Sequence, residues 1–149
     1  MNAPNETVTK ALQSTLVELI DLALVGKQAH WSVVGPQFRS IHLELDEIVD
    51  LARDQYDRVA ERLATIGVAP DGRAETVSTT SELQPFPPGF VAATDTVQRV
   101  TQVMDTIAVR MKERIIAVGD DDPVSQDILI GAMDELEKAA WMLRSQLTM

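Results

Sequence analysis

Both histidines of this 149-residue chain, His30 and His42, lie in a stretch that also carries carboxylates at helical spacing. His42 and Asp46 are four residues apart, and so are Asp57 and Glu61. Residues four apart share one face of an α-helix, with about 5–6 Å between their Cβ atoms. Imidazole nitrogens and carboxylate oxygens suit Fe(II), Mn(II) or Zn(II) as ligands. Each pair is therefore a candidate half of a metal site.

The two pairs are too far apart along one helix to hold the same ion. Eleven residues separate Asp46 from Asp57, so the pairs share one side of the helix but lie about 16 Å apart along its axis. Metal–ligand bonds are only about 2 Å long. Either each pair finds further ligands in its own chain, or two copies of the helix cross antiparallel about a twofold axis. In the second arrangement His42 and Asp46 of one chain meet Asp57 and Glu61 of the other, and His30 can join them from the end of the preceding helix.

An ordinary explanation exists for the same acids. Carboxylates at spacing four are common on solvated helix faces, and Arg53, Arg58 and Arg62 are close enough in sequence to pair with them. The presence of both histidines of a histidine-poor chain beside these acids favours a metal site. Spacing alone leaves both interpretations open.

The stretch resembles the Dps family, the mini-ferritins first described as DNA-binding proteins from starved cells. The resemblance rests on K-Q-A-H-W at Lys27–Trp31, followed by V-x-G-P-x-F. It continues with H-x-x-x-D at His42–Asp46 and D-x-x-x-E-R at Asp57–Arg62. These motifs cover the core of the first two expected helices with their spacing intact, and the rest of the chain has a suitable length and helical pattern.

The resemblance implies a site shared between subunits. Its ligands would be His30, His42 and Asp46 from one subunit with Asp57 and Glu61 from the twofold partner. It implies a ferroxidase that binds Fe(II), oxidises it preferably with hydrogen peroxide, and stores ferric mineral in a hollow homo-oligomer of twelve subunits, so protecting against oxidative stress. The same ligands also suit zinc or manganese.

Trp31, next to the first histidine, has two interpretations. By resemblance to the family, a tryptophan near the site intercepts oxidising equivalents, so Trp31 is counted with the catalytic residues. The alternative is an aromatic side chain that packs in a subunit interface.

The composition indicates a folded, acidic protein. Hydrophobic residues make up 45% of the chain, and 23 acidic against 13 basic residues give a net charge of −10. This charge argues against simple electrostatic binding to nucleic acid and favours attraction of cations. Cysteine is absent, which excludes disulfides and thiolate chemistry. Without an apolar signal core or a long apolar run, we expect a cytoplasmic protein with no membrane contact.

The apolar periodicity predicts four long helices, at about 6–34, 37–66, 90–118 and 123–146, in a single domain over 1–149. Asn5 or Thr7 is the expected cap of the first helix, and Asp122 followed by Pro123 the expected start of the last. The long connection between the second and third helices is rich in proline and glycine, and we expect one short helix near Ser78–Leu83. The fold class is all-α, a ferritin-like four-helix bundle with a crossover.

Two further groups of acids have candidate roles. If corners of three subunits meet, acids there would ring a pore that attracts Fe(II); the resemblance places Asp121, Asp122 and Asp127 in this role, whereas Asp120 fits a solvated loop better. Three other acids of the second helix could face the cavity and nucleate mineral: Glu47, Asp50 and Asp54.

Direct DNA binding is not expected. Family members that bind DNA usually carry tails rich in lysine or arginine, but no basic residue precedes the first expected helix and the last residues, RSQLTM, add no basic extension. The alternatives are a DNA-compacting cage, a metal-dependent hydrolase that uses the same carboxylate–histidine site to activate water, and a structural cage without redox chemistry. No H-E-x-x-H or G-x-S-x-G motif supports the hydrolase.

Overall fold

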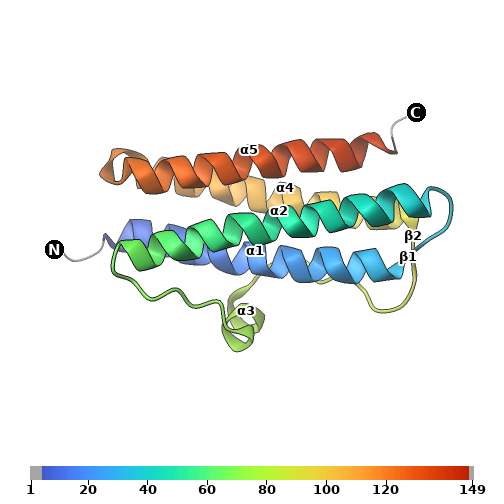
Figure 1. The fold of residues 1–149 in the computed structure, drawn as a ribbon, viewed down its shortest axis with the longest axis horizontal. Helices are drawn as coiled ribbons and strands as arrows, with labels where there is room; N and C mark the ends of the chain where they lie inside the picture. The colour runs from blue at the N-terminus through green and yellow to red at the C-terminus, as the bar shows by residue number, and fades with distance from the viewer. Residues whose placement is uncertain (1–4, 148–149) are drawn as a thin grey trace.

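Four long helices lie side by side in the computed structural model, which describes residues 5–147 (Figure 1). The helices are α1 (Glu6–Ser32), α2 (Phe38–Thr65), α4 (Ala93–Val118) and α5 (Pro123–Ser145). Short connections join α1 to α2 and α4 to α5, and the long connection from α2 to α4 carries the small helix α3 (Ala74–Thr80). The predicted all-α, ferritin-like bundle with one crossover is confirmed.

Two short strands that the sequence analysis did not predict lie at the end of α1. The strands β1 (Val33–Val34) and β2 (Val91–Ala92) pair in parallel, with Val33 opposite Val91. For this reason α1 ends at Ser32 instead of residue 34, and α4 begins at Ala93 instead of residue 90. The pairing of these two strands holds the chain in place from Val33, three residues after His30.

The short helix lies four residues earlier than expected. It spans Ala74–Thr80, whereas the prediction placed it near Ser78–Leu83. Asp71 determines its start, because this carboxylate accepts hydrogen bonds from the Arg73 backbone N–H at 3.3 Å and from the Thr76 hydroxyl at 2.8 Å. The chain is extended again at Ser81, where the helix ends.

The expected caps of the long helices are present. The Asn5 side chain accepts hydrogen bonds from the backbone N–H groups of Thr7 and Val8, at 2.9 and 3.3 Å. Asp122 accepts from the Ser125 backbone N–H at 3.0 Å, and Pro123 opens α5. Both helix starts therefore follow from local side-chain chemistry.

The core is one cluster formed by the apolar stripes of the four helices. Its largest fully buried side chains are Leu12, Leu16, Leu19, Leu22, Ile41, Leu45, Ile48, Leu63, Met104, Ile107, Met111 and Leu129. Trp141 lies outside this core and is 62% exposed. No helix within residues 5–147 combines the length and the hydropathy needed to cross a membrane.

A close contact between α1 and α2 lies one turn before His30. A Cβ atom placed on Gly26 would be 2.9 Å from Cγ2 of Val49, which is too close for any side chain. Glycine therefore lets the two helices approach each other here. This close approach brings the end of α1 against the first half of α2, where His42 and Asp46 lie.

Candidate metal centre

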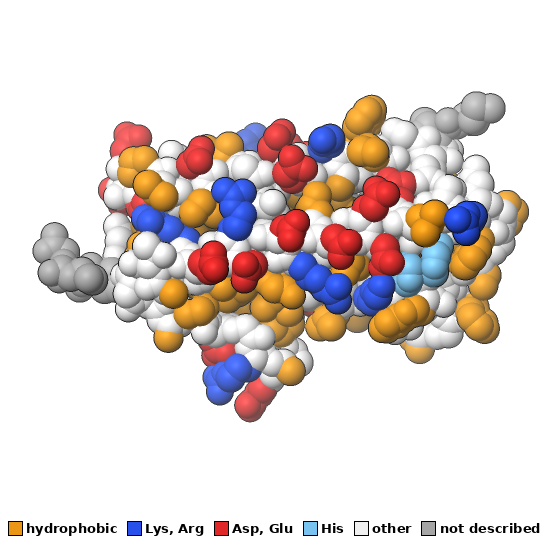
Figure 2. Space-filling model, in the orientation of Figure 1, with side chains coloured by type: hydrophobic (Ala, Val, Ile, Leu, Met, Phe, Trp, Pro, Cys, Tyr) orange, Lys and Arg blue, Asp and Glu red, His pale blue; other side chains and the backbone are white. Residues whose placement is uncertain are grey.

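The two histidines meet where α1 ends and α2 begins. Their rings stack with centroids 3.6 Å apart and an interplanar angle of 18°. His30 is buried and His42 half-buried, and the Phe38 ring stacks on the outer face of His42 at 4.9 Å. Figure 2 shows that histidine side chains reach the surface at one end of a row of acidic and basic side chains.

Reciprocal hydrogen bonds determine the tautomer of both rings. Nδ1 of His30 lies 2.7 Å from the backbone carbonyl of His42, and Nδ1 of His42 lies 2.7 Å from the carbonyl of His30. A carbonyl only accepts, so each Nδ1 must carry the hydrogen. In a neutral imidazole the lone pair is then on Nε2. Both rings are therefore held in the tautomer that binds a metal ion through Nε2, as second-shell carbonyls do at known metal sites.

Asp46 lies beside the two histidines. Its Oδ1 lies 3.7 Å from Nδ1 of His30 and forms an ion pair with the Lys27 ammonium. The hydrogen bond from Lys27 lowers the pKa of Asp46 below its ordinary value; the charges of His30, Lys27 and His42 act in the same direction, and partial desolvation opposes them. Asp46 is consequently an anion across the neutral pH range and can bind a cation.

Lys27 competes with a metal ion for Asp46, because its ammonium already neutralises that carboxylate. We expect Lys27→Met, which keeps most of the apolar stem, to tighten Zn(II) or Co(II) binding about tenfold. Titration calorimetry on the assembled protein measures the dissociation constant. Lys112→Met, at an exposed position of α4, makes the same charge change away from the site. Weaker binding by the Lys27 variant alone would mean that Lys27 orients Asp46 for the metal.

Asp57 and Glu61 lie further along α2 and are not part of this cluster. Both are exposed, and neither forms a salt bridge with another described residue. Within residues 5–147 of one chain, no group of three or more histidine, aspartate or glutamate side chains has a metal-binding arrangement. His30, His42 and Asp46 lie together in one chain, and their role as one half of a metal site stays a prediction.

Two of the arginines close to these acids in sequence, Arg53 and Arg62, contact other acids. Nη2 of Arg62 donates to both carboxylate oxygens of Asp122, each at 2.9 Å. Arg53 has an Nη1 atom 3.9 Å from Oδ1 of Asp50. Within residues 5–147 Asp57 and Glu61 have no ion pair with Arg53, Arg58 or Arg62, and both acids are exposed, as on an ordinary solvated helix face.

The candidate pore acids have different surroundings. Asp122 caps α5 and pairs with Arg62; burial raises the pKa of this carboxyl, but hydrogen bonds from Ser125 and Arg62 outweigh burial, so its pKa is lowered overall. Asp121 accepts a hydrogen bond from Asn5 at 3.1 Å, and Asp127 is exposed. Their role in a pore stays a prediction.

Trp31 is 64% exposed beside the half-site, with the Lys27 ammonium 6.0 Å from its ring centroid. It borders a hollow of about 500 Å³ between α1, α2 and the connection before β2. The hollow is lined in part by Leu24, Tyr56 and Phe86. An exposed apolar wall next to an incomplete site is a surface that a second subunit can cover.

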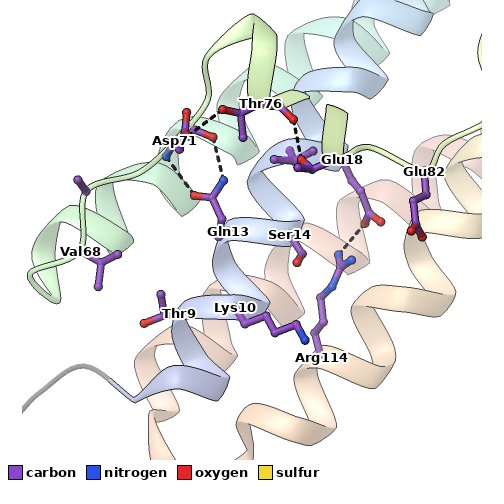
Figure 3. Close-up of a pocket in the computed structure, with 13 residues that line it drawn as sticks. Thr9, Lys10, Gln13, Ser14, Glu18, Val68, Asp71, Thr76, Glu82 and Arg114 are labelled. Atoms are coloured by element: carbon purple, nitrogen blue, oxygen red, sulfur yellow. Dashed lines mark hydrogen bonds and ion pairs between the residues drawn. The ribbon is translucent and has the colours of Figure 1, made fainter. Parts of the chain in front are cut away.

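A second hollow, of about 660 Å³, lies between α1, α4 and the connection that contains α3 (Figure 3). Gln13 joins its walls, because its amide donates to the Asp71 carbonyl at 2.8 Å and accepts from the Asp71 N–H at 3.0 Å. Glu18 pairs there with Arg114 at 2.6 Å. Neither histidine lines this hollow. The hydrogen bonds of Gln13 at its wall hold the connection between α2 and α4 against α1.

Comparison with known proteins identifies the family of the chain. The ferritin-like domain family matches residues 9–149. The chain is 37% identical to the fine tangled pili major subunit of Haemophilus ducreyi, over 97% of this chain and 77% of that one. It is 33% identical to the DNA protection during starvation protein of Agrobacterium fabrum, over 93% and 86%. It is 35% identical to DNA protection during starvation protein 2 of Deinococcus radiodurans, over 91% of this chain but little more than half, 56%, of that protein.

Solved structures show the same fold. The crystal structure of Dps92 from Deinococcus radiodurans superposes with a TM-score of 0.93 at 34% identity, covering 96% of this chain and 87% of that one. Dps from Microbacterium arborescens in its high iron form gives a TM-score of 0.86 at 29% identity, with 99% of both chains covered. The chain belongs to the Dps family of ferritin-like proteins.

Proposed function

We propose that this protein is an iron-oxidising and iron-storing mini-ferritin whose sites form between two copies of the chain. His30, His42 and Asp46 of one subunit bind the ion together with the partner's Asp57 and the partner's Glu61. The observation that carries the proposal is the stacked pair of imidazoles, each with its Nδ1 bonded to a carbonyl, which leaves Nε2 as the atom for a metal. By helix geometry, Asp57 lies about 16 Å beyond Asp46 along α2, so Asp57 and Glu61 must come from another copy of the chain.

A single twofold axis can bring His42 opposite the partner's Glu61 and Asp46 opposite the partner's Asp57 at the same time. In two antiparallel copies of one helix, facing positions lie at equal distances from the axis. The midpoint between His42 and Glu61 falls between residues 51 and 52, and the midpoint between Asp46 and Asp57 falls at the same place. One axis there makes both contacts and produces two identical sites per pair of subunits.

The ligands suit iron as the substrate. Carboxylate oxygens stabilise Fe(III) over Fe(II), because hard anions favour the more highly charged ion. With hydrogen peroxide as oxidant, two Fe(II) ions each give one electron, and the peroxide takes up two protons and leaves as two water molecules. Ferric product is then stored inside a closed homo-oligomer of twelve subunits in the cytoplasm. The iron-loaded Dps relative supports this choice of metal.

We propose that protection comes from removing iron and peroxide, and that direct DNA binding is not part of it. Several relatives are named for DNA protection during starvation. The net charge of −10 works against contact with phosphates, whose neutralisation dominates DNA affinity.

The test of this function is Fe(II) oxidation by hydrogen peroxide, followed by absorbance, with particle mass measured by light scattering on the same sample. We expect oxidation well above the protein-free rate in a particle of about twelve subunits. A particle of that size without oxidation would reject the redox function. Release of amine from an N-acyl substrate by the metal-loaded protein, in the absence of oxidation, would favour the hydrolase.

A further inference from the structure

Two exposed residues of opposite charge lie on α2 midway between the half-sites. At 3.6 residues per turn, positions 42, 46, 50, 53, 57 and 61 fall within an arc of about 100°. Asp50 and Arg53 are thus on the same face as the candidate ligands. Their side chains are 78% and 53% exposed, and the 3.9 Å between Arg53 Nη1 and Asp50 Oδ1 is a weak contact. A solvated pair of this kind contributes little within one chain.

We propose that the twofold axis passes between these residues, so that Asp50 of each subunit pairs with the partner's Arg53. The proposal rests on the intersubunit site proposed above and names the contact that fixes its register. The midpoint of positions 50 and 53 falls between residues 51 and 52, which is also the midpoint of both ligand pairs. Two such pairs, related by the axis, form a ring of four alternating charges between the two metal sites.

The neighbouring positions on this face are compatible with the same axis. Leu43, which is 46% exposed, faces the partner's Ala60, and Arg39 faces the partner's Ala64. Large side chains therefore meet small ones. These positions fall within the same arc of the helix as the ligands.

Electrostatics distinguishes this register from a shifted one. With the axis between residues 51 and 52, Asp46 opposite the partner's Asp57 is the like-charged pair, and a metal cation between them removes the repulsion. If the partner is shifted by four residues, Asp50 faces the partner's Asp57 and Asp46 faces the partner's Glu61. Both of these pairs are acidic and repel. Arg53 then faces the partner's Asp54 instead of the partner's Asp50. The charge ring thus opposes a shift that would break up the ligand set.

Charge reversal tests the contact. Arg53→Asp and Asp50→Arg each place like charges across the axis, and we expect either variant to lose most assembled particle by light scattering and at least tenfold in Zn(II) affinity. Arg58→Asp is the matched control, because Arg58 is exposed on another side of α2 and the charge change is the same. The control should assemble and bind zinc as the unmodified protein does.

Mixing the two single variants gives the decisive result. One variant carries two acids and the other two bases at these positions, so a mixed pair restores attraction at every contact of the ring. We expect equimolar refolding of the two, and separately the double variant D50R/R53D, to recover particle mass and zinc binding. Circular dichroism checks that each single variant is still helical.

Two results would overturn the charge ring. Single variants that match Arg58→Asp would show that these residues do not face each other, and defects that neither mixing nor the double variant repairs would show that the pairing is wrong. Failure here is distinct from failure of the proposed function. Iron oxidation by the unmodified protein that depends on its histidines would stand in either case.

Discussion

Replacing His30 and His42 together by alanine is expected to lower the initial rate of Fe(II) oxidation by roughly a hundredfold or more. Changes in residues that merely orient metal ligands cost 10–100-fold, and here two ligands are removed. Particle mass should not change, because both residues lie where α1 ends and α2 begins, outside the apolar core cluster of the bundle. Stopped-flow absorbance with peroxide at low iron loading measures the rate.

The control for this double variant also carries two substitutions, but it keeps both histidines. Lys112→Ala combined with Glu113→Ala changes two exposed residues of α4 and leaves the net charge unaltered. This control should oxidise iron at the unmodified rate. A histidine-free variant that matched it would show that oxidation occurs elsewhere, for example at acids of the cavity surface.

The largest effect on stability is expected for Glu18→Gln. Glu18 is 5% exposed on α1 and accepts a hydrogen bond from Arg114 of α4 at 2.6 Å (Figure 3). It accepts another from Arg110, also on α4, at 2.8 Å. Loss of its charge leaves two partly buried guanidinium groups without their counter-ion, which costs about 3 kcal/mol or more. In a chain of this size, that lowers the melting temperature by roughly 10 °C.

Glu82→Gln is the matched control for Glu18. This substitution also removes a negative charge next to Arg110. The Glu82 side chain, however, is 84% exposed, and its carboxylate is 3.9 Å from Arg110. Solvent-exposed pairs contribute at most about 1 kcal/mol. Calorimetry at a fixed subunit concentration compares the two, since assembly also affects melting. Equal, small shifts would mean that the Glu18 pairs are solvated in solution.

Local chemistry predicted much of the fold. Apolar periodicity located the four long helices, and the caps at Asn5 and Asp122 are as expected because a capping side chain bonds to N–H groups two or three residues away. The displaced short helix was not predictable in this way. Its start depends on Asp71, whose backbone is held by Gln13 of α1, 58 residues earlier.

The sequence predicted which residues are candidate ligands, but it did not predict the hydrogen bonds between His30 and His42. Helical spacing alone separated the candidate ligands into two groups, and within residues 5–147 the histidines and the second pair of acids form no common metal-binding cluster. The reciprocal bonds between His30 and His42 depend on how closely α1 approaches α2 at Gly26, which is a property of packing. The role of Lys27 was also missed, although its position three residues before His30 places both on neighbouring turns of one helix.

The central claim is that each site takes ligands from two subunits, and mixed assembly tests it directly. One variant, His30→Ala with His42→Ala, keeps its acids; the other, Asp57→Asn with Glu61→Gln, keeps its histidines. Each should be inactive alone. Random pairing makes half of the pairs mixed, with one intact site of two, so co-refolded subunits should recover about a quarter of the unmodified oxidation rate. A mixture as inactive as its components, in particles of normal mass, would contradict a shared site.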